Sequence, residues 1–139
     1  MPSQKNSTAA ALQPGRIGTA SLVVDDSHTA QRFGSGRAPV FATPAMVALM
    51  EAAAVACVED QLDPGQETLG VHFEIDHIAA TPVGLKVTAS AELIEHDGRK
   101  LVFRVEARTD QEAIGRGRHT RVIVESARFR NKVAAKRTS

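Results

Sequence analysis

The sequence predicts an α+β domain in which an antiparallel sheet curls around one long, apolar helix. A Thr-Pro pair at residues 43–44 precedes a nearly uncharged run, Ala45–Val58. Three later segments alternate apolar and polar residues with a period of two, as half-buried strands do. Short connections join these segments and leave no room for the crossover helices that parallel strands need. A sheet wrapped around the helix explains why the helix carries so few polar positions.

The helix is expected to begin with Thr43 as N-cap and Pro44 at the first helical position. It should end near residues 60–62, before the Pro-Gly pair at 64–65. Its apolar run is shorter than the roughly 20 residues that a bilayer requires, and Glu51 interrupts it. The pattern therefore favours a buried helix of a soluble protein over a membrane span.

The remaining segments are assigned in chain order. Residues 17–24 favour a strand, and the glycine- and serine-containing residues 25–39 favour a long loop. In the segment 70–80, alternation places Val71, Phe73, Ile75 and His77 on one face. Strands are also expected over 85–96, 99–109 and 113–129, and a tight turn at Asp97-Gly98. We thus predict an N-terminal tail (1–15), one domain (16–132) and a basic C-terminal tail (133–139).

Composition excludes several classes of protein. The 139 residues suit one domain, and 17 basic against 16 acidic residues give a formal net charge of +1, which offers nucleic acid no general attraction. The chain has five Phe but no Trp or Tyr. A single cysteine excludes an intrachain disulfide and a Cys-rich zinc site, and no histidine pair has metal-ligand spacing. Residues 1–15 do not have the pattern of a secretory signal, so we expect a cytoplasmic protein. We also expect no metal, because of the histidine spacing, and no membrane partner, because the longest apolar run is too short to span a bilayer.

Three side chains fit a purely structural interpretation poorly. Glu51 is the only charged residue between Pro44 and Val58, so it either lies on a narrow solvent-facing or interface stripe of the helix or serves as a base or nucleophile in a dry pocket. His77 lies on an apolar face, either as a satisfied core histidine or as a positioned base. Thr43 either caps the helix or offers a hydroxyl near its positive end.

Basic residues gather near the C-terminus. The GRGRH segment, 115–119, contains a G-x-G, but it lies in a strand and no helix follows, so a bulge or a close backbone approach is the better interpretation. The basic side chains beyond it either form a solvated end or offer a place for a phosphorylated carrier such as coenzyme A; they are Arg128, Arg130, Lys132, Lys136 and Arg137.

Together, three segments resemble hotdog-fold acyl-CoA thioesterases, and in particular the fluoroacetyl-CoA thioesterase family. They are VFATPAMVALMEAAA, LGVHFEIDHIAATPVGLKVTASAEL and DGRKLVFRVEARTDQEAIGRGRHTR. The combination of T-P before the helix, M-E within it and H-x-A-A-T-P-x-G after it is specific. The resemblance covers about residues 40–132.

The resemblance implies a hotdog fold, an antiparallel sheet wrapped around a long helix, and a homodimer or dimer of dimers with active sites at the subunit interface. It implies catalytic roles for Thr43, Glu51 and His77. It also implies substrate contacts from Gly70 and Arg121.

The family further implies an aromatic lid from the N-terminal segment, for which only Phe33 is available here.

We therefore expect an acyl-CoA thioesterase that hydrolyses a small acyl-CoA, with no cofactor other than the coenzyme A of its substrate. An enoyl-CoA hydratase on the same fold and a non-catalytic acyl-CoA-binding module remain alternative functions. For the thioesterase itself, direct hydrolysis by water and a route through an acyl-enzyme both remain open. Thr43 and Glu51 are eight residues apart, about 12 Å along a helix, so one hydrogen bond cannot join them. We expect Thr43 to lie outside the regular helix, in a cleft with His77, and Glu51 to be buried.

Overall fold

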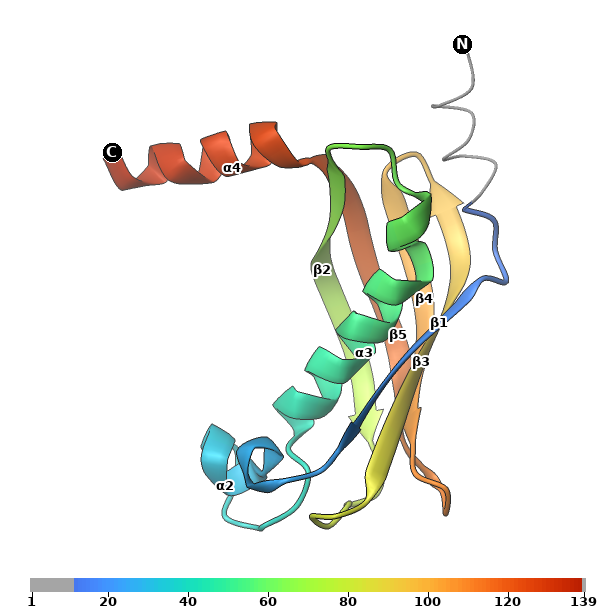
Figure 1. The fold of residues 1–139 in the computed structure, drawn as a ribbon, viewed down its shortest axis with the longest axis vertical. Coiled ribbons are helices and arrows are strands. Elements are labelled where there is room, and N and C mark those ends of the chain that lie inside the picture. Colours follow the sequence, from blue (N-terminus) through green and yellow to red (C-terminus); the bar gives the residue numbers. More distant parts are fainter. Residues whose placement is uncertain (1–11, 139) are drawn as a thin grey trace.

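The computed structural model describes residues 12–138, and in it one antiparallel sheet curves around a central helix (Figure 1). The strand order is β1-β3-β4-β5-β2, so β1 and β2 are the two edges. The α+β prediction is confirmed. The strands are β1 (Ile17–Val23), β2 (Gln66–His77), β3 (Lys86–Asp97), β4 (Lys100–Arg108) and β5 (Ala113–Glu125).

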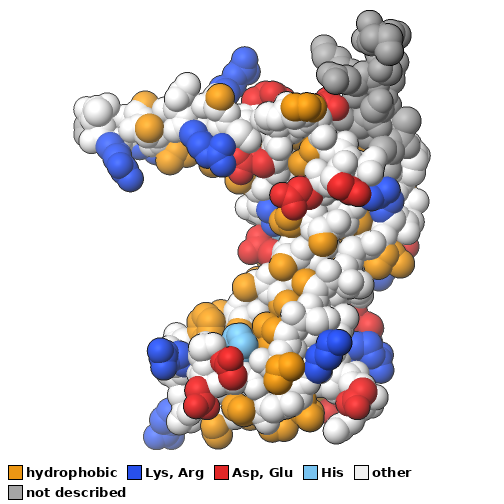
Figure 2. All heavy atoms as spheres, in the orientation of Figure 1, with side chains coloured by type: hydrophobic (Ala, Val, Ile, Leu, Met, Phe, Trp, Pro, Cys, Tyr) orange, Lys and Arg blue, Asp and Glu red, His pale blue; other side chains and the backbone are white. Residues whose placement is uncertain are grey.

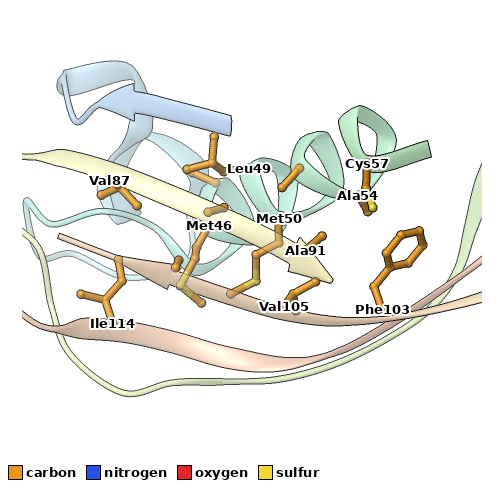
Figure 3. Packing of buried hydrophobic residues seen from close by; sticks show 14 of the residues in the cluster. Met46, Leu49, Met50, Ala54, Cys57, Val87, Ala91, Phe103, Val105 and Ile114 are labelled. Atoms are coloured by element: carbon orange, nitrogen blue, oxygen red, sulfur yellow. The ribbon is translucent and has the colours of Figure 1, made fainter. Parts of the chain in front are cut away.

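Helix α3 (Thr43–Val58) fills the concave side of the sheet and packs mainly on β1 and β3. Its apolar side chains point towards the strands and pack against inward-facing residues such as Val87, Val105 and Ile114 (Figure 3). The inward-facing residues expected on β3 and β4 are almost all fully buried. Within residues 12–138, no helix combines the length and apolar character needed to cross a membrane. The core includes Met46, Met50, Val58, Val87, Leu93, Leu101, Phe103, Val105 and Ile114.

The start of α3 differs from the expected cap. Ala42 is the N-cap and makes no side-chain capping bond, and Thr43 is already helical. The expectation that Thr43 lies outside the regular helix is therefore wrong. The Thr43 hydroxyl bonds to another residue instead of capping the first turn, and Pro44 still occupies the first turn as its fixed φ favours. The helix ends at Val58, and a 3₁₀ helix (Glu59–Gln61) covers the rest of the expected length.

A β-bulge in β2 changes the face assignment of one residue. The register of β2 against β5 shifts between Gly70 and His72, so Val71 has no partner and is 59% exposed. Strict alternation wrongly placed Val71 inward, because an extra residue in one strand resets the alternation. Phe73 and His77, beyond the bulge, face the helix side as expected.

The loop before α3 and the segment after β5 contain more helix than expected. The loop 25–39 contains a 3₁₀ helix (Asp26–His28) and the short helix α2 (Ala30–Phe33). Strand β5 ends at Glu125, four residues earlier than expected, and α4 (Ser126–Ala134) follows. A 3₁₀ helix (Ala135–Thr138) continues α4, so the described part of the C-terminal tail is helical and exposed.

The expected N-terminal tail, residues 1–15, includes residues that belong to the domain. Residues 1–11 lie outside the described part of the chain, but Leu12 is fully buried in the core. The Gly15 N–H donates to the carbonyl of Leu93 at 2.8 Å, which ties the segment to β3. The ordered domain therefore begins by residue 12, because an apolar side chain there completes the core.

Close packing of β1 on α3 depends on Gly18. A Cβ at this position would collide with the Ala53 carbonyl oxygen and with the backbone of Cys57. Both obstacles are backbone atoms of a buried helix, which cannot turn away as a side chain can. We expect Gly18→Ala to lower the free energy of unfolding by about 1–3 kcal/mol, the usual range for overpacking.

Urea denaturation measures this effect, with Thr19→Ala, an exposed position on the same strand, as the control. A loss for Gly18→Ala no larger than that of the control would show that β1 does not rest on the helix backbone as described.

Candidate active site

A hydroxyl–imidazole pair lies where the N-terminus of α3 meets the C-terminal end of β2. Thr43 Oγ1 and His77 Nδ1 are 2.7 Å apart. The hydroxyl belongs to Thr43 in the first turn of α3. The ring belongs to His77, the last residue of β2, which lies on the face of the strand that is directed towards the helix. As expected, Thr43 and His77 of the same chain line one cleft, an open cavity of about 410 Å³.

The environment of His77 favours a neutral ring. Burial lowers the pKa of His77 below its ordinary value of 6.5, and a weaker backbone interaction with Ala79 opposes the shift. Its second nitrogen, Nε2, is buried and has no hydrogen-bond partner within residues 12–138. A neutral imidazole 2.7 Å from a hydroxyl can accept its proton, which is the arrangement that activates a weak nucleophile.

A second polar cluster joins α3 to the middle of the sheet. Arg121 Nη1 donates to Glu51 Oε2 at 3.0 Å. The same guanidinium donates from Nε to Thr68 Oγ1 at 2.9 Å and from Nη2 to the Thr68 carbonyl at 3.0 Å. Arg121 is buried, so these bonds and the carboxylate of Glu51 compensate for its lost hydration. The cluster holds the Glu51 carboxylate in a fixed position.

His119 completes this cluster beneath Arg121. Its Nδ1–H donates to the carbonyl of His72 at 2.8 Å, so its Nε2 is free to accept from Arg121 Nη1 at 3.1 Å. The ring stacks on Phe73 with centroids 4.0 Å apart. Burial lowers the pKa of His119, and the neighbouring Arg121 charge adds to the shift. A neutral His119 therefore supports the guanidinium from below.

Gly70 makes room for the ion pair. A Cβ on Gly70 would lie 2.5 Å from Glu51 Oε2 and 3.2 Å from Arg121 Nη1. The three residues that the sequence associates with separate roles, Gly70, Glu51 and Arg121, thus form one contact group. The pair of Thr43 and His77 forms another.

The two groups are not joined within one chain. Glu51 bonds to Arg121 and has no recorded contact with Thr43 or His77, in agreement with the eight-residue spacing along α3. The expectation that Glu51 is buried is wrong for the single chain, where its side chain is 42% exposed. The reason is that Glu51 lies at the margin of the contact between α3 and the sheet, where its carboxylate bonds to Arg121 of β5 and still reaches solvent.

Phe33 does not line the cavity next to Thr43. It ends α2 and is 49% exposed, whereas the cavity is lined by Ala30 before it and mostly by residues after it. Sequence reasoning missed two lining residues, the buried Phe41 and the exposed Arg37. Nothing in the local pattern distinguishes Phe41 from an ordinary core residue.

Thr68 and His119 were also missed, although a signal for His119 existed. His119 alternates with Gly117 and Arg121 along β5, so it had to share the inward face with Arg121. The same face explains the two glycines of the GRGRH segment. A Cβ on Gly115 would meet the Met46 sulfur, and one on Gly117 would meet the backbone of Glu74, which confirms the close backbone approach expected there.

A curled antiparallel sheet around one apolar helix is the architecture of the hotdog fold. A thioesterase superfamily member of Thermus thermophilus matches the structure with a TM-score of 0.85 at 27% identity, covering 91% of this chain and 94% of that one. The hotdog fold expected from the sequence is therefore confirmed.

More narrowly, the model of the FlK family, fluoroacetyl-CoA-specific thioesterase, matches residues 24–127. The fluoroacetyl-CoA thioesterase of Streptantibioticus cattleyicolor is 44% identical over 97 residues, which are 70% of each chain. A solved structure of the fluoroacetyl-CoA thioesterase FlK has a TM-score of 0.84 at 37% identity and covers 89% of this chain and 96% of that one. The chain belongs to this family and is an acyl-CoA thioesterase, a thioester hydrolase.

The half-buried His77 and the buried His119 make stability depend on pH. Because the pKa values of folded His77 and His119 lie below 6.5, the unfolded chain binds more protons in acid. The free energy of unfolding is expected to keep its full value above about pH 6.5. It should decrease as the pH falls from there to the folded-state pKa values.

Imidazole ¹⁵N–¹H NMR measures both titrations, with His77→Gln and His119→Gln as assignment controls. It should also show His119 as the Nδ1–H tautomer at neutral pH. Titration of either ring at or above pH 6.5 would contradict the description of its environment.

Proposed function

We propose that the chain hydrolyses small acyl-CoA thioesters, including fluoroacetyl-CoA-like substrates, through the pair of Thr43 and His77. The 2.7 Å contact between the hydroxyl and the half-buried imidazole, on the wall of a cavity, carries this proposal. All the chemistry is assigned to side chains and backbone, so no metal and no cofactor apart from the coenzyme A of the substrate is needed.

The packing of the interior supports a small acyl group. Met46, Met50 and Phe103 fill the space between α3 and the sheet and are fully buried (Figure 3). A long acyl chain needs an apolar tunnel into this region, and the packed side chains occupy it. The acyl group is therefore confined to the open cavity, whose wall is built mostly from small residues such as Gly36, Ala42 and Ala79.

In the first chemical step, Thr43 attacks the thioester. His77 Nδ1 accepts the hydroxyl proton while Oγ1 bonds to the carbonyl carbon. The carbon–sulfur bond then breaks, and the proton on His77 passes to the departing thiolate to give free CoA. The acyl group remains as an ester on Thr43.

The N-terminus of α3 suits the negative charge that develops on the carbonyl oxygen. The first-turn N–H groups of a helix have no intrahelical acceptor, and no side chain caps α3. Pro44 has no N–H, so the available donors next to the nucleophile are those of Thr43 and Ala45. Together with the helix dipole they form the proposed oxyanion site.

Glu51 is assigned to the second step, in which water hydrolyses the ester. An ionised carboxylate can take a proton from the water as it attacks, and the Thr43 oxygen regains a proton when the ester bond breaks. The bond from Arg121 fixes the carboxylate, and its 42% exposure leaves one side open. Because Glu51 is distant from Thr43 along its own helix, we assign it to the acyl group held by the partner subunit.

A homodimer, alone or paired into a dimer of dimers, is the proposed assembly. The outer side of α3 carries the exposed Ala48, Ala52 and Ala56, an apolar stripe that a single chain leaves in water. The neighbouring edge strand β2 is twelve residues long and has an unpaired edge, with the exposed Val71 beside it. Helices α2 and α4 both lie on the β2 side (Figure 1), and the surface is hollowed between them (Figure 2).

The buried, unpaired Cys57 is consistent with a reducing compartment, and we propose a cytoplasmic location on that basis.

A panel of acyl-CoA thioesters with free-thiol detection tests the function. The wild-type protein should release CoA from acetyl- and fluoroacetyl-CoA at least about tenfold more efficiently than from long-chain thioesters, for the packing reason given above. Thr43→Ala and Glu51→Gln should each lower turnover of a good substrate by about 10²-fold or more, while Thr43→Ser keeps part of the activity.

Glu74→Gln, on the exposed face of β2, is the matched control for Glu51. Wild-type turnover in a folded Thr43→Ala protein would refute the assigned nucleophile. Hydration of an enoyl-CoA without thiol release would identify a hydratase, and binding without turnover an acyl-CoA-binding module.

The assembly can be measured separately by light scattering at micromolar concentration. We expect at least a dimer, and Ala52→Arg should dissociate it by placing a charge on the apolar side of α3. Thr88→Arg, on the sheet, is a control for the added charge. A monomeric wild-type protein would contradict an active site shared between subunits.

A further inference from the structure

The base of α4 forms a second pocket, distant from Thr43 and His77. It has a volume of about 310 Å³ and lies where β5 passes into the helix. Its apolar floor contains the half-buried ring of Phe129 and the buried Ile123. The lining residues are Gln66, Arg99, Ile123, Val124, Glu125, Arg128, Phe129 and Lys132.

The rim of this pocket is positively charged. Arg99, Arg128 and Lys132 come from the β3–β4 turn and from two successive turns of α4, and none has an ion pair within residues 12–138. The one carboxylate of the lining, Glu125, accepts a hydrogen bond from Gln66 Nε2 at 3.2 Å. Lys and Arg side chains extend along the projecting helix (Figure 2). Three unpaired cations around an aromatic ring favour a ligand that has both phosphates and a flat base.

We propose that this pocket binds the phosphorylated adenosine end of the CoA substrate and serves the Thr43–His77 pair of the partner subunit. The inference rests on the proposed function, because it takes the acyl-CoA substrate and the homodimer from it. Adenine would lie against Phe129, and the phosphates would contact Arg128, Lys132 and Arg99.

Distance assigns the pocket to the partner. Gln66 and His77 are the two ends of β2, about 36 Å apart at about 3.3 Å per residue. The pantetheine arm of one CoA is too short to join these ends within one chain. A two-fold axis that places two β2 edges side by side in antiparallel order brings the Gln66 end of one strand next to the His77 end of the other. The projection of α4 beyond the β2 edge then carries its cations over the partner (Figure 1).

The first experiment compares two thioesters in the full-length protein. Acetyl-CoA carries the nucleotide, and S-acetyl-N-acetylcysteamine does not. In the Arg128→Gln/Lys132→Gln variant, the ratio of kcat/KM for acetyl-CoA to that for the truncated thioester should fall by about tenfold or more, mostly through KM, because charge-assisted contacts are lost.

Arg130→Gln is the matched control, since Arg130 lies on the same helix but pairs with Glu67 at 3.0 Å and does not line the pocket. An unchanged ratio, or an equal fall in the control, overturns the proposal. Loss of inhibition by 3′,5′-ADP with an unchanged ratio would assign the pocket to a free nucleotide and would also overturn it. Hydrolysis of neither thioester by the wild type would instead refute the proposed function.

A mixed dimer tests the use of the pocket between subunits. One protomer carries His77→Ala with an intact α4, and the other carries Arg128→Gln/Lys132→Gln with an intact His77. If the pocket serves the partner, this dimer retains one normal site and shows the wild-type KM at about half the wild-type kcat. A raised KM, as in the homodimeric Arg128→Gln/Lys132→Gln variant, would overturn the assignment.

Discussion

The absence of a polar face on α3 is the constraint on which the rest of the structure depends. Its residues are apolar almost all the way round, so every side of the helix must be covered. The sheet curls around one side and buries Met46, Met50 and Val58 there. The other side exposes Ala48, Ala52 and Ala56 in a single chain, and Glu51 lies at its margin. The same constraint that shapes the sheet therefore supports the proposed partner subunit, which would cover these alanines and approach Glu51.

The two polar groups of the site follow from the way in which β2 runs along α3. The bulge at Val71 divides the strand into two parts. Before the bulge, Thr68 and Gly70 lie against the ion pair of Glu51 and Arg121. After it, His77 turns towards the N-terminus of α3 and meets Thr43. The two groups differ in their hydrogen bonding: Arg121 bonds to Glu51, Thr68 and His119, whereas His77 keeps an unpartnered nitrogen in a buried position. The bonds of Arg121 hold the Glu51 carboxylate in place, and the pair of Thr43 and His77 retains the freedom to move a proton.

Much of this arrangement could be predicted from the sequence, because it depends on simple periodicity. The alternation of apolar residues predicts the inward faces of β3 and β4, the apolar run 45–58 predicts the position of α3, and His77 faces inward as expected despite the bulge. The position of Val71 was not predictable, since one extra residue in a strand changes no composition signal. The prediction that Thr43 is the N-cap is wrong for a different reason. A hydroxyl that can cap a helix can equally bond to an imidazole that is distant in the sequence, and the local sequence does not distinguish these two partners. Likewise, the hydrogen bond between Arg121 and His119 can be predicted only when the register of β5 in the sheet is known, and alternation along the strand does not give that register.

We propose that a substrate held between two subunits presents its carbonyl carbon to Thr43. A crystal structure of the protein with a non-hydrolysable thioether analogue of acetyl-CoA tests this proposal. We expect a dimer in which the analogue's carbonyl lies against Thr43 Oγ1 and the first turn of α3, with Glu51 of the partner subunit on its other side. An analogue whose carbonyl contacts the Glu51–Arg121 pair and lies away from Thr43 and His77 would contradict it.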